Sequence, residues 1–399
     1  MVASFALGRL PRITFGPGGF ARLPELVAGH GRRVLLVTGG RSLAASGRRE
    51  ALLAGLAAAG VALAGEVTVA DEPSPAVVDT AVAAHRDAGV DVVLGVGGGS
   101  VLDAAKAIAG LLRTGASVVD HLEGLPAMRA YEGPSVPFVA VPTTAGTGSE
   151  ATRNAVITKR GPAGYKRSFR DERLVAADAV VDPDLLAGND PERIAANGMD
   201  ALTQLLEAYT SLRAGPLTDA LALSGLEAAR DGLMAWHADP DGPGAAVARA
   251  GMAYAALLSG ICLAHAGLGA VHGLASPIGA RFPVPHGAAC GATLAAVTAV
   301  NIGALADREP GSPALDRYAT LGRLMARLPA STTGPEARGA LVLALSEWSA
   351  TLGVPRLRAF GIGEADIPAI VADARGSSMK TNPVVLTDGE LAAILAATI

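Results

Sequence analysis

A glycine-rich stretch between an apolar run and a helix-forming run constrains the fold of this chain more than any other feature. Residues 95–100 read Gly-Val-Gly-Gly-Gly-Ser, after the β-type run 90–94 and before the helical run 101–112. Glycines let a backbone turn tightly and approach an anion, and a helix N-terminus offers unpaired N–H groups and the positive end of a dipole. The stretch therefore predicts either a phosphate-binding turn close to the G-x-G-x-x-G pattern or a plain turn in which Ser100 and Asp103 form a capping box.

Composition argues against several kinds of partner and location. The 399 residues carry 33 Lys and Arg against 37 Asp and Glu, a net charge of −4 with no basic stripe, which argues against nucleic acid and anionic membranes. The first nine residues hold no long apolar segment, so we expect no signal peptide. The apolar run 51–65 is too short to span a bilayer and is expected to be a buried helix. Cys262 and Cys290 lie in apolar stretches, so we expect reduced core thiols in a cytoplasmic protein.

Strand-like and helix-like runs alternate over the first half of the chain. This alternation predicts a parallel, doubly wound α/β domain over residues 1–187, with an edge strand near its start. The expected strands are 34–38, 67–69, 90–94, 136–141, 156–166 and 179–181, and the expected helices are 44–59, 75–88 and 101–112.

The pattern changes near residue 188. From Pro191 on it is nearly all helical, which predicts an all-α second domain over residues 188–399. The expected helices are 191–212, 216–235, 243–275, 286–305, 314–328, 335–352 and 364–374.

A second polar turn follows the expected strand 136–141. Residues 142–150 read Pro-Thr-Thr-Ala-Gly-Thr-Gly-Ser-Glu. Neighbouring parallel strands end at one edge of a sheet, so this turn and the glycine stretch are expected to lie together where α/β proteins bind ligands. The pair predicts a dinucleotide site, although either turn alone also fits an ordinary loop.

Polar residues with helical spacing stand out in the second half. Asp200 and Gln204 are four residues apart, which places them on one helix face among apolar neighbours. His272 lies in an apolar helical stretch, and His286 follows Pro285, which favours a helix start. A carboxylate, an amide oxygen and two imidazoles would form a four-ligand site for Fe²⁺ or Zn²⁺ with room for a substrate oxygen, but the same spacing fits buried core residues.

Four stretches, in this order, resemble the iron-containing (group III) alcohol dehydrogenase family. They are Gly95–Lys106 (GVGGGSVLDAAK), Val141–Glu150 (VPTTAGTGSE), Gly198–Tyr209 (GMDALTQLLEAY) and Leu268–Gly287 (LGAVHGLASPIGARFPVPHG). The resemblance implies the dehydroquinate synthase-like fold, with the active site in the cleft between an α/β and a helical domain. It also implies reversible hydride transfer between a nicotinamide cofactor and a small alcohol or its aldehyde or ketone. A homodimer is usual among such proteins, here through the edge strand 12–15.

The resemblance implies roles for individual residues. The implied cofactor-binding residues are Gly97, Gly98, Gly99, Ser100, Asp103, Thr143, Thr144, Thr147 and Lys166. Asp200, His272 and His286 match metal ligands, and the two histidines are also the expected catalytic residues. Gln204 stands where the family usually has a His, as in a branch with Gln at this position. An amide oxygen is a poorer ligand than imidazole for Fe²⁺ or Zn²⁺, so we expect weaker metal retention.

Proton transfer must differ from that of many family members. Ser276 stands where they have a His near the substrate. A relay would use the Ser276 hydroxyl, water, a ribose hydroxyl or His265. His265 is seven residues before His272, on the same face of the expected helix 243–275, and would reach the cleft or bond within the core.

Cofactor choice is expected to favour NADP over NAD. Many NAD-dependent members have an Asp after the second strand, where it binds the ribose 2′-hydroxyl. This chain has Gly39 there, followed by Arg41 and Ser42. Without the carboxylate a 2′-phosphate is not repelled, and the Arg and Ser side chains are suited to bind it.

Three alternatives to a metal-dependent alcohol dehydrogenase stay open. A metal-independent reduction like that of maleylacetate reductase, or a hydroxyacid–oxoacid type of reaction, needs cationic cleft residues such as Arg153, Arg170 and Arg281. A cyclisation of the dehydroquinate synthase type fits the motifs less well. Gln204 and Ser276 also motivate a nucleotide-binding member that has lost catalysis.

Overall fold

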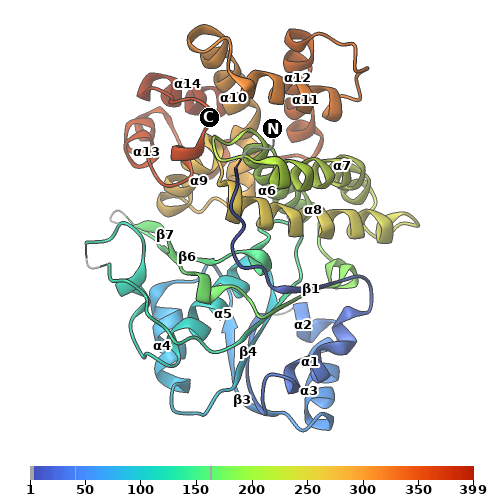
Figure 1. Ribbon diagram of the computed structural model, residues 1–399, viewed down its shortest axis with the longest axis vertical. Helices are drawn as coiled ribbons and strands as arrows, with labels where there is room; N and C mark the ends of the chain where they lie inside the picture. Colours follow the sequence, from blue (N-terminus) through green and yellow to red (C-terminus); the bar gives the residue numbers. More distant parts are fainter. Residues whose placement is uncertain (1–3, 41, 127, 162–163) are drawn as a thin grey trace.

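A six-stranded parallel sheet forms the middle layer of the N-terminal part (Figure 1). The computed structural model describes residues 4–40, 42–126, 128–161 and 164–399. The strand order is β1-β8-β5-β4-β2-β3, and every pairing is parallel, as predicted. The strands are β1 Arg12–Phe15, β2 Arg33–Gly39, β3 Ala62–Val69, β4 Val92–Gly97, β5 Phe138–Pro142 and β8 Asp178–Val181.

Alternate residues of the central strands enter two hydrophobic cores. On β2, Val34 and Leu36 face the core formed with α1 and α3, whereas Leu35 and Val37 face the core formed with α4 and α5. Because helices cover both faces, the strand is apolar throughout rather than alternating. The helices of this part are α1 Leu23–Ala28, α2 Ser42–Ala45, α3 Arg48–Ala58, α4 Pro75–His85 and α5 Gly99–Leu111.

Two expectations for this part are wrong. The apolar run 51–65 is not one buried helix, because α3 ends at Ala58 and the chain turns at Gly60 (φ 72°) into β3. The expected strand 156–166 is an antiparallel hairpin, with β6 at Asn154–Lys159 and β7 at Tyr165–Arg170, that forms a separate sheet. In both places a turn interrupts a run whose composition alone predicts continuity.

The C-terminal part is helical and packs around α6, which contacts α7, α8 and α10. Between β8 and α6 runs the segment that contains the predicted boundary at residue 187. The helices are α6 Pro191–Thr210, α7 Pro216–Ala238, α8 Ala245–Ala266, α9 Ala270–Arg281, α10 His286–Arg308, α11 Pro313–Met325, α12 Gly334–Thr351, α13 Ile367–Asp373 and α14 Asp388–Thr398.

The expected helix 243–275 is broken into α8 and α9. Gly267 has a φ of 73°, which ends α8, and its position allows no side chain because a Cβ would lie 2.8 Å from Oγ1 of Thr381. The C-terminal segment seals this break: Oγ1 of Thr381 donates to the carbonyl of Leu268 at 2.5 Å, and Oδ1 of Asn382 accepts from the N–H of Ala270 at 3.0 Å. Residues distant in sequence therefore fix where α9 begins.

Two helices, α8 and α10, are long and apolar enough to cross a membrane by length and composition. In each, however, 61% of the most apolar window is buried against the rest of the chain. They serve as core helices of the C-terminal part. Cys262 on α8 and Cys290 on α10 are both buried free thiols, as predicted.

Candidate active site

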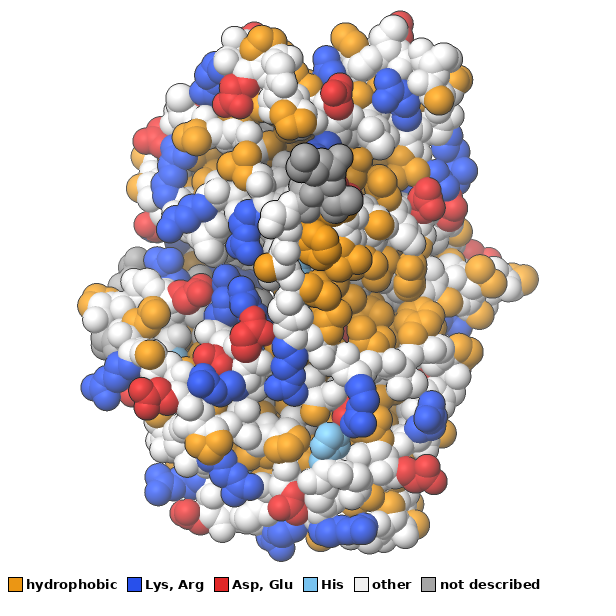
Figure 2. Space-filling model, viewed as in Figure 1, with side chains coloured by type: hydrophobic (Ala, Val, Ile, Leu, Met, Phe, Trp, Pro, Cys, Tyr) orange, Lys and Arg blue, Asp and Glu red, His pale blue; other side chains and the backbone are white. Residues whose placement is uncertain are grey.

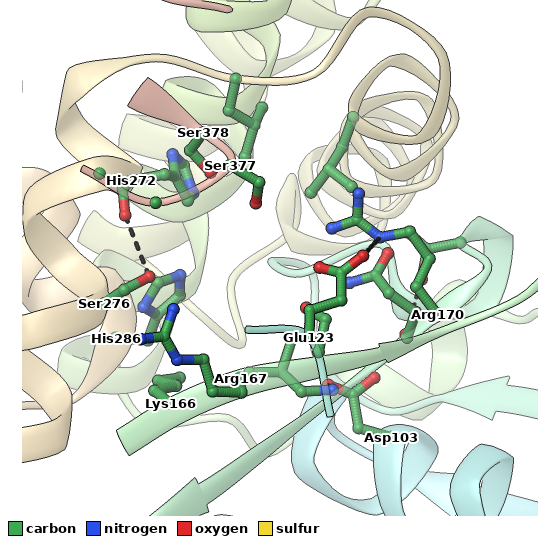
Figure 3. A pocket seen from close by; sticks show the side chains of 18 of the residues that line it. Asp103, Glu123, Lys166, Arg167, Arg170, His272, Ser276, His286, Ser377 and Ser378 are labelled. Carbon is green, nitrogen blue, oxygen red and sulfur yellow. Dashed lines mark hydrogen bonds and ion pairs between the residues drawn. The ribbon is translucent and has the colours of Figure 1, made fainter. Parts of the chain in front are cut away.

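A cleft of about 660 Å³ lies between the α/β part and the helical part. Gly99 of α5 and Thr147 of the loop after β5 line one side. Gln204 of α6, His272 of α9 and His286 of α10 line the other side. Strand β7 runs along the cleft below the two histidines (Figure 3). The predicted dinucleotide-binding turns and the predicted metal-binding residues thus line the same cleft.

The two polar turns lie side by side, as predicted. Gly97 ends β4, which pairs with β5. A Cβ on Gly99 would lie 2.6 Å from Oγ1 and Cγ2 of Thr147, and a Cβ on Gly98 would lie 3.2 Å from Oγ1 of Thr144. The glycines therefore allow a contact between the turns that side chains would prevent. This contact brings the first turn of α5, with its backbone N–H groups, to the cleft.

The strand order reverses between β2 and β4. These strands are neighbours in the sheet, although β3 lies between them in the chain. Open α/β sheets bind ligands at such a switch point, beyond the carboxyl ends of the strands. Gly39 ends β2 at this point. Arg41 lies outside the described residues, as does the side chain of Ser42, which begins α2.

Asp103 lines the cleft but does not cap α5, so the capping-box interpretation is wrong. The N-cap residue is Gly98, in extended backbone conformation. Oδ1 of Asp103 accepts from the Ser149 hydroxyl at 2.5 Å, and Oδ2 accepts from the N–H of Val156 at 3.0 Å. The carboxyl group thus ties α5 to β6 and to the loop after β5, and burial raises its pKa.

Two buried ionisable groups, which the sequence analysis missed, support the loop after β5. Nζ of Lys106 donates to the carbonyl of Ser149 and to Oγ1 of Thr152, both at 2.8 Å. Burial lowers the pKa of Lys106 to about 8 and raises the pKa of Glu150 to about 7. The cost of burying a charge is offset here only by fixed dipoles and by the opposite charge nearby.

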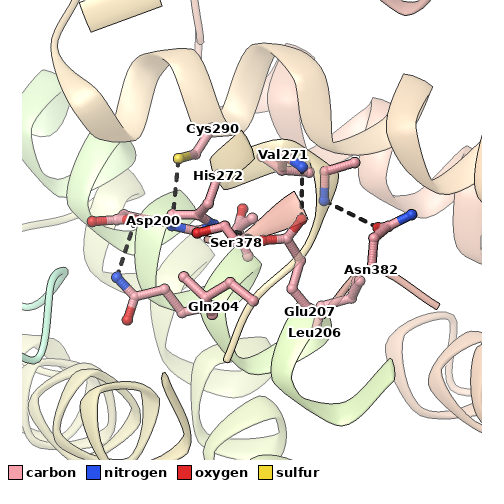
Figure 4. A network of polar contacts seen from close by, with 12 residues as sticks. Asp200, Gln204, Leu206, Glu207, Val271, His272, Cys290, Ser378 and Asn382 are labelled. Atoms are coloured by element: carbon pink, nitrogen blue, oxygen red, sulfur yellow. Dashed lines mark hydrogen bonds and ion pairs between the residues drawn. The ribbon is translucent and has the colours of Figure 1, made fainter. Parts of the chain in front are cut away.

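Four side chains that bind metals in proteins converge in the helical part; Figure 4 shows three of them, Asp200, His272 and Cys290. Asp200, His272, His286 and Cys290 offer ligand atoms that all lie within 4.8 Å of one another. Oδ1 of Asp200 is 3.2 Å from Nε2 of His272 and 3.9 Å from Nε2 of His286. His286 begins α10, as its proline neighbour predicted. This set of oxygen, nitrogen and sulfur donors, buried except for the half-buried His286, fits a divalent transition metal.

Burial and neighbouring charges shift the pKa values of the ionisable groups in this cluster. Burial, together with the charge of Lys166, lowers the pKa of His286 to about 4, so its imidazole is neutral. Burial also raises the pKa of the Cys290 thiol. Metal binding must therefore release the thiol proton if the sulfur is to coordinate.

Glu207 fixes the orientation of His272. Its Oε2 lies 2.6 Å from Nδ1 of His272, and its Oε1 accepts from the N–H of Val271 at 2.7 Å. The carboxylate holds the proton on Nδ1, so Nε2 is the nitrogen that a metal would take. Burial lowers the pKa of His272, but the charge of Cys290 and the hydrogen bonds to Asp200, Cys290 and Glu207 raise it well above its usual value. Metal binding must therefore also displace the proton that Nε2 shares with Asp200. The sequence analysis missed Glu207, although it follows Asp200 by seven residues on the same face of α6.

Gln204 lies beside the cluster, on the predicted helix face. Its Nε2 donates to Oδ1 of Asp200 at 3.3 Å, and its Oε1 accepts from the Ser259 hydroxyl at 2.9 Å. The amide oxygen, which is the atom predicted to bind a metal, is therefore engaged by α8.

The two candidates for proton transfer differ in position. His265 is not on the same helix as His272, because the chain turns at Gly267, so that expectation is wrong. Nδ1 of His265 lies 2.7 Å from the carbonyl oxygen of Ile261 in its own helix. Ser276 lines the cleft and donates to the carbonyl of His272 at 3.2 Å (Figure 3).

Positive charge is concentrated along the cleft, and Figure 2 shows Lys and Arg side chains gathered near the level of β6 and β7. Lys166 pairs with Glu72 at 2.7 Å, and Nε of Arg170 lies 3.4 Å from Glu123. Arg281, another candidate from the sequence, forms an ion pair with α13 instead. The cations that line the cleft are Arg153, Lys166, Arg167, Arg170, Arg213, Arg375 and Lys380.

Comparison with models of protein families shows which family this chain belongs to. Residues 11–183 match the model of iron-containing alcohol dehydrogenase, and residues 194–399 match that of the C-terminal part of the Fe-containing family. The chain belongs to the iron-containing alcohol dehydrogenase family. It is therefore an oxidoreductase of the kind that acts on alcohols and aldehydes.

Individual relatives agree with this membership. Lactaldehyde reductase of Escherichia coli K12 is 32% identical over 365 residues, 90% of each chain. The 1,3-propanediol dehydrogenase of Klebsiella pneumoniae is 32% identical over 390 residues, 95% of each chain. A crystal structure of 1,3-propanediol oxidoreductase superposes with a TM-score of 0.88 at 29% identity, covering 100% of both chains. The iron-containing alcohol dehydrogenase of Thermococcus thioreducens gives a TM-score of 0.84 at 26% identity, covering 99% of both.

Proposed function

We propose that this protein transfers hydride reversibly between NAD(P)(H) and a small alcohol or its aldehyde or ketone, with a divalent metal held beside Asp200, His272 and His286. The single observation that carries the proposal is the shared cleft, which is lined by the first turn of α5 and by both histidines. When bound there, the nicotinamide supplies the hydride and the metal polarises the substrate oxygen.

The protein's own residues are proposed to bind the cofactor, orient a metal ligand, shield a second ligand from water and transfer a proton. The first turn of α5, at Gly99 and Ser100, presents N–H groups for a diphosphate. Glu207 holds the Nδ1 proton of His272, so that Nε2 is the nitrogen that would bind the metal. Asp200 is only 2% exposed, so the helices shield this carboxylate from water, whereas His286 borders the cleft. Ser276, with its hydroxyl in the cleft, is the proposed relay for the substrate proton.

The test compares metal content with turnover on the same samples. The protein is stripped with a chelator, reloaded anaerobically with Fe²⁺ or Zn²⁺, and assayed for NADPH oxidation with a panel of aldehydes. We expect activity to follow metal content, and His272→Ala to lose metal while it retains NADPH binding. Full activity of the stripped protein would favour the metal-independent alternative, and nucleotide binding without turnover would favour a member that has lost catalysis.

For the cofactor we propose NADP(H) rather than NAD(H). At the switch point, Gly39 offers no carboxylate that would repel a 2′-phosphate. A Cβ at this position would meet Cγ2 of Val101 at 3.7 Å, an ordinary contact, so an acidic side chain is accommodated. We expect a lower KM for NADPH than for NADH, and a reversed preference in Gly39→Asp. A wild-type preference for NADH would contradict the proposal.

A substrate with an anionic group is a second candidate, supported by the cations of the cleft. Within the described part of the chain, no carboxylate lies within 4.0 Å of the charged nitrogens of Arg167, Arg213 or Lys380. Succinic semialdehyde and butanal differ chiefly in the carboxylate, so their kcat/KM values test this point. We expect Arg213→Met to raise KM for the anionic aldehyde alone. An equal rise with both aldehydes would assign the side chain to another role, including contact with the cofactor.

A further inference from the structure

We infer that Cys290 is a metal ligand of this protein, so that a thiolate takes the place in the donor set where the family usually has a fourth side chain at position 204. This inference rests on the metal-dependent function proposed above. Sγ of Cys290 lies 3.8 Å from Nε2 of His272 and 3.9 Å from Nε2 of His286. These three atoms and a carboxylate oxygen of Asp200 all lie within 4.8 Å of one another.

The separations between these atoms are a few tenths of an ångström wider than those of a closed coordination sphere, apart from the contact between Asp200 and His272. Metal–nitrogen and metal–oxygen bonds of about 2.0–2.1 Å and a metal–sulfur bond of about 2.3 Å place tetrahedral ligands about 3.3 Å apart for nitrogen and oxygen, and about 3.6 Å apart for sulfur and nitrogen. The observed distances from Asp200 are 3.2 and 3.9 Å, and those from Cys290 are 3.8 and 3.9 Å. Small side-chain rotations therefore suffice to close the sphere.

The surroundings of Cys290 differ from those of the other cysteine. Cys262 is also buried, but its thiol donates to the carbonyl of Thr218 at 3.6 Å. Among the described residues, the polar contacts of the Cys290 sulfur are the two imidazole nitrogens. His286 and Cys290 are four residues apart on α10, so one helix face presents both donors to the cluster.

Gln204 leaves its place in the donor set open. Its amide oxygen accepts from Ser259, and its Nε2 is the atom that faces Asp200. Gln204 also lines the cleft together with His272 and His286, whereas Cys290 is fully buried. If the sulfur of Cys290 completes the set of protein ligands, these ligands bind the metal from the interior of the helical part. The position that faces the cleft, near Gln204, then stays available to a substrate oxygen.

Ligand chemistry then selects the metal. Thiolates are soft donors that favour Zn²⁺, and Asp, His and Cys together are the donor types of zinc sites. Although the family is named for iron, we infer that this protein retains Zn²⁺ in preference to Fe²⁺. Competition between the two metals under anaerobic conditions measures this preference directly.

The decisive experiment replaces the metal by Co²⁺, because a cobalt–thiolate bond gives a charge-transfer band in the near ultraviolet. We expect the band in the wild type and in the control Cys262→Ser, but not in Cys290→Ser. Loss of an outer-shell partner alone costs 10–100-fold in metal affinity, so loss of the sulfur is expected to cost at least about 100-fold. Gln204→Leu is expected to keep the band and to bind Co²⁺ within about threefold of the wild type.

The outcomes separate this inference from the proposed function. Co²⁺ that binds the wild type without the band, or Cys290→Ser with wild-type affinity and an unchanged thermal unfolding curve, overturns the sulfur ligand and leaves the metal-dependent function intact. Strong loss of metal in Gln204→Leu but not in Cys290→Ser would assign the ligand to the amide instead. A wild type that turns over fully without metal overturns the proposed function itself.

Discussion

Glu207→Gln tests whether a buried carboxylate controls the metal site without touching the metal. In the wild type, Oε1 accepts from the N–H of Val271 at 2.7 Å, so a glutamine oxygen is expected to keep this bond. The new amide nitrogen then faces Nδ1 of His272, where two donors cannot pair. The imidazole relieves the conflict by moving its proton to Nε2, which is the atom directed at Asp200.

The size of the effect follows from burial and distance. Glu207 and His272 are 4% and 5% exposed, and their contact of 2.6 Å is charge-assisted. Loss of a group that orients a metal ligand lowers metal affinity by about 10–100-fold, and so buried and short a contact favours the upper end of this range. We expect a loss of metal affinity near 100-fold, or about 2.7 kcal/mol.

Chelator competition with Zn²⁺ or Co²⁺ measures this affinity, and NADPH binding serves as a check on the fold. The matched control is Glu227→Gln, the same change on the exposed face of α7. If Glu207→Gln binds metal as tightly as this control, Glu207 does not set the protonation of His272 and the argument is refuted.

Three further predictions follow from the α/β part. Gly99→Ala places a Cβ 2.6 Å from the Thr147 side chain, so we expect NADPH affinity to fall about tenfold in a fluorescence titration. Gly303→Ala, in open space on α10, should leave that affinity unchanged. The pKa of Glu150 is raised by burial to about 7, so the folded state holds its proton above pH 4.5 while the unfolded chain releases it. Stability should therefore fall between about pH 4.5 and pH 7, and Glu150→Gln should remove up to about 3 kcal/mol of this decrease in chemical denaturation; an equal pH dependence of both proteins would contradict it. We also propose a homodimer through the edge strand β1, where Ile13 is 38% exposed and Figure 2 shows hydrophobic side chains gathered over the adjacent α7 and α8. Light scattering should then show dimers for the wild type and monomers for Ile13→Lys, and a monomeric wild type would refute the proposal.

The sequence predicted the sheet and both polar turns because their constraints are local. The glycines around Gly99 indicate the turn between a buried strand and a helix from neighbouring residues alone, whatever the rest of the chain does. The hairpin of β6 and β7 and the break at Gly267 were not predictable in this way. A single glycine in an apolar run costs a helix only about 1 kcal/mol, so its effect depends on tertiary partners such as Thr381.

The candidate site was predictable in part for the same reason. Asp200, His272 and His286 stood out because charged or polar groups are rare in apolar helices. Cys290 did not stand out, since a buried thiol and a ligating thiol have the same apolar neighbours in sequence. Cys290 follows His286 by four residues, and Glu207 follows Asp200 by seven. These spacings indicate a shared site only once the fold has brought α6, α9 and α10 together.

The seal at the break between α8 and α9 also determines when each half of the site can form during synthesis. The nucleotide-binding sheet is complete once β8 has left the ribosome, whereas the start of α9 is held by Thr381 and Asn382, which follow their partners Leu268 and Ala270 by 113 and 112 residues. His272 lies in the first turn of that helix. A nascent chain is therefore expected to complete its nucleotide-binding sheet before its metal site, because the start of α9 waits for residues more than 100 positions further along the chain.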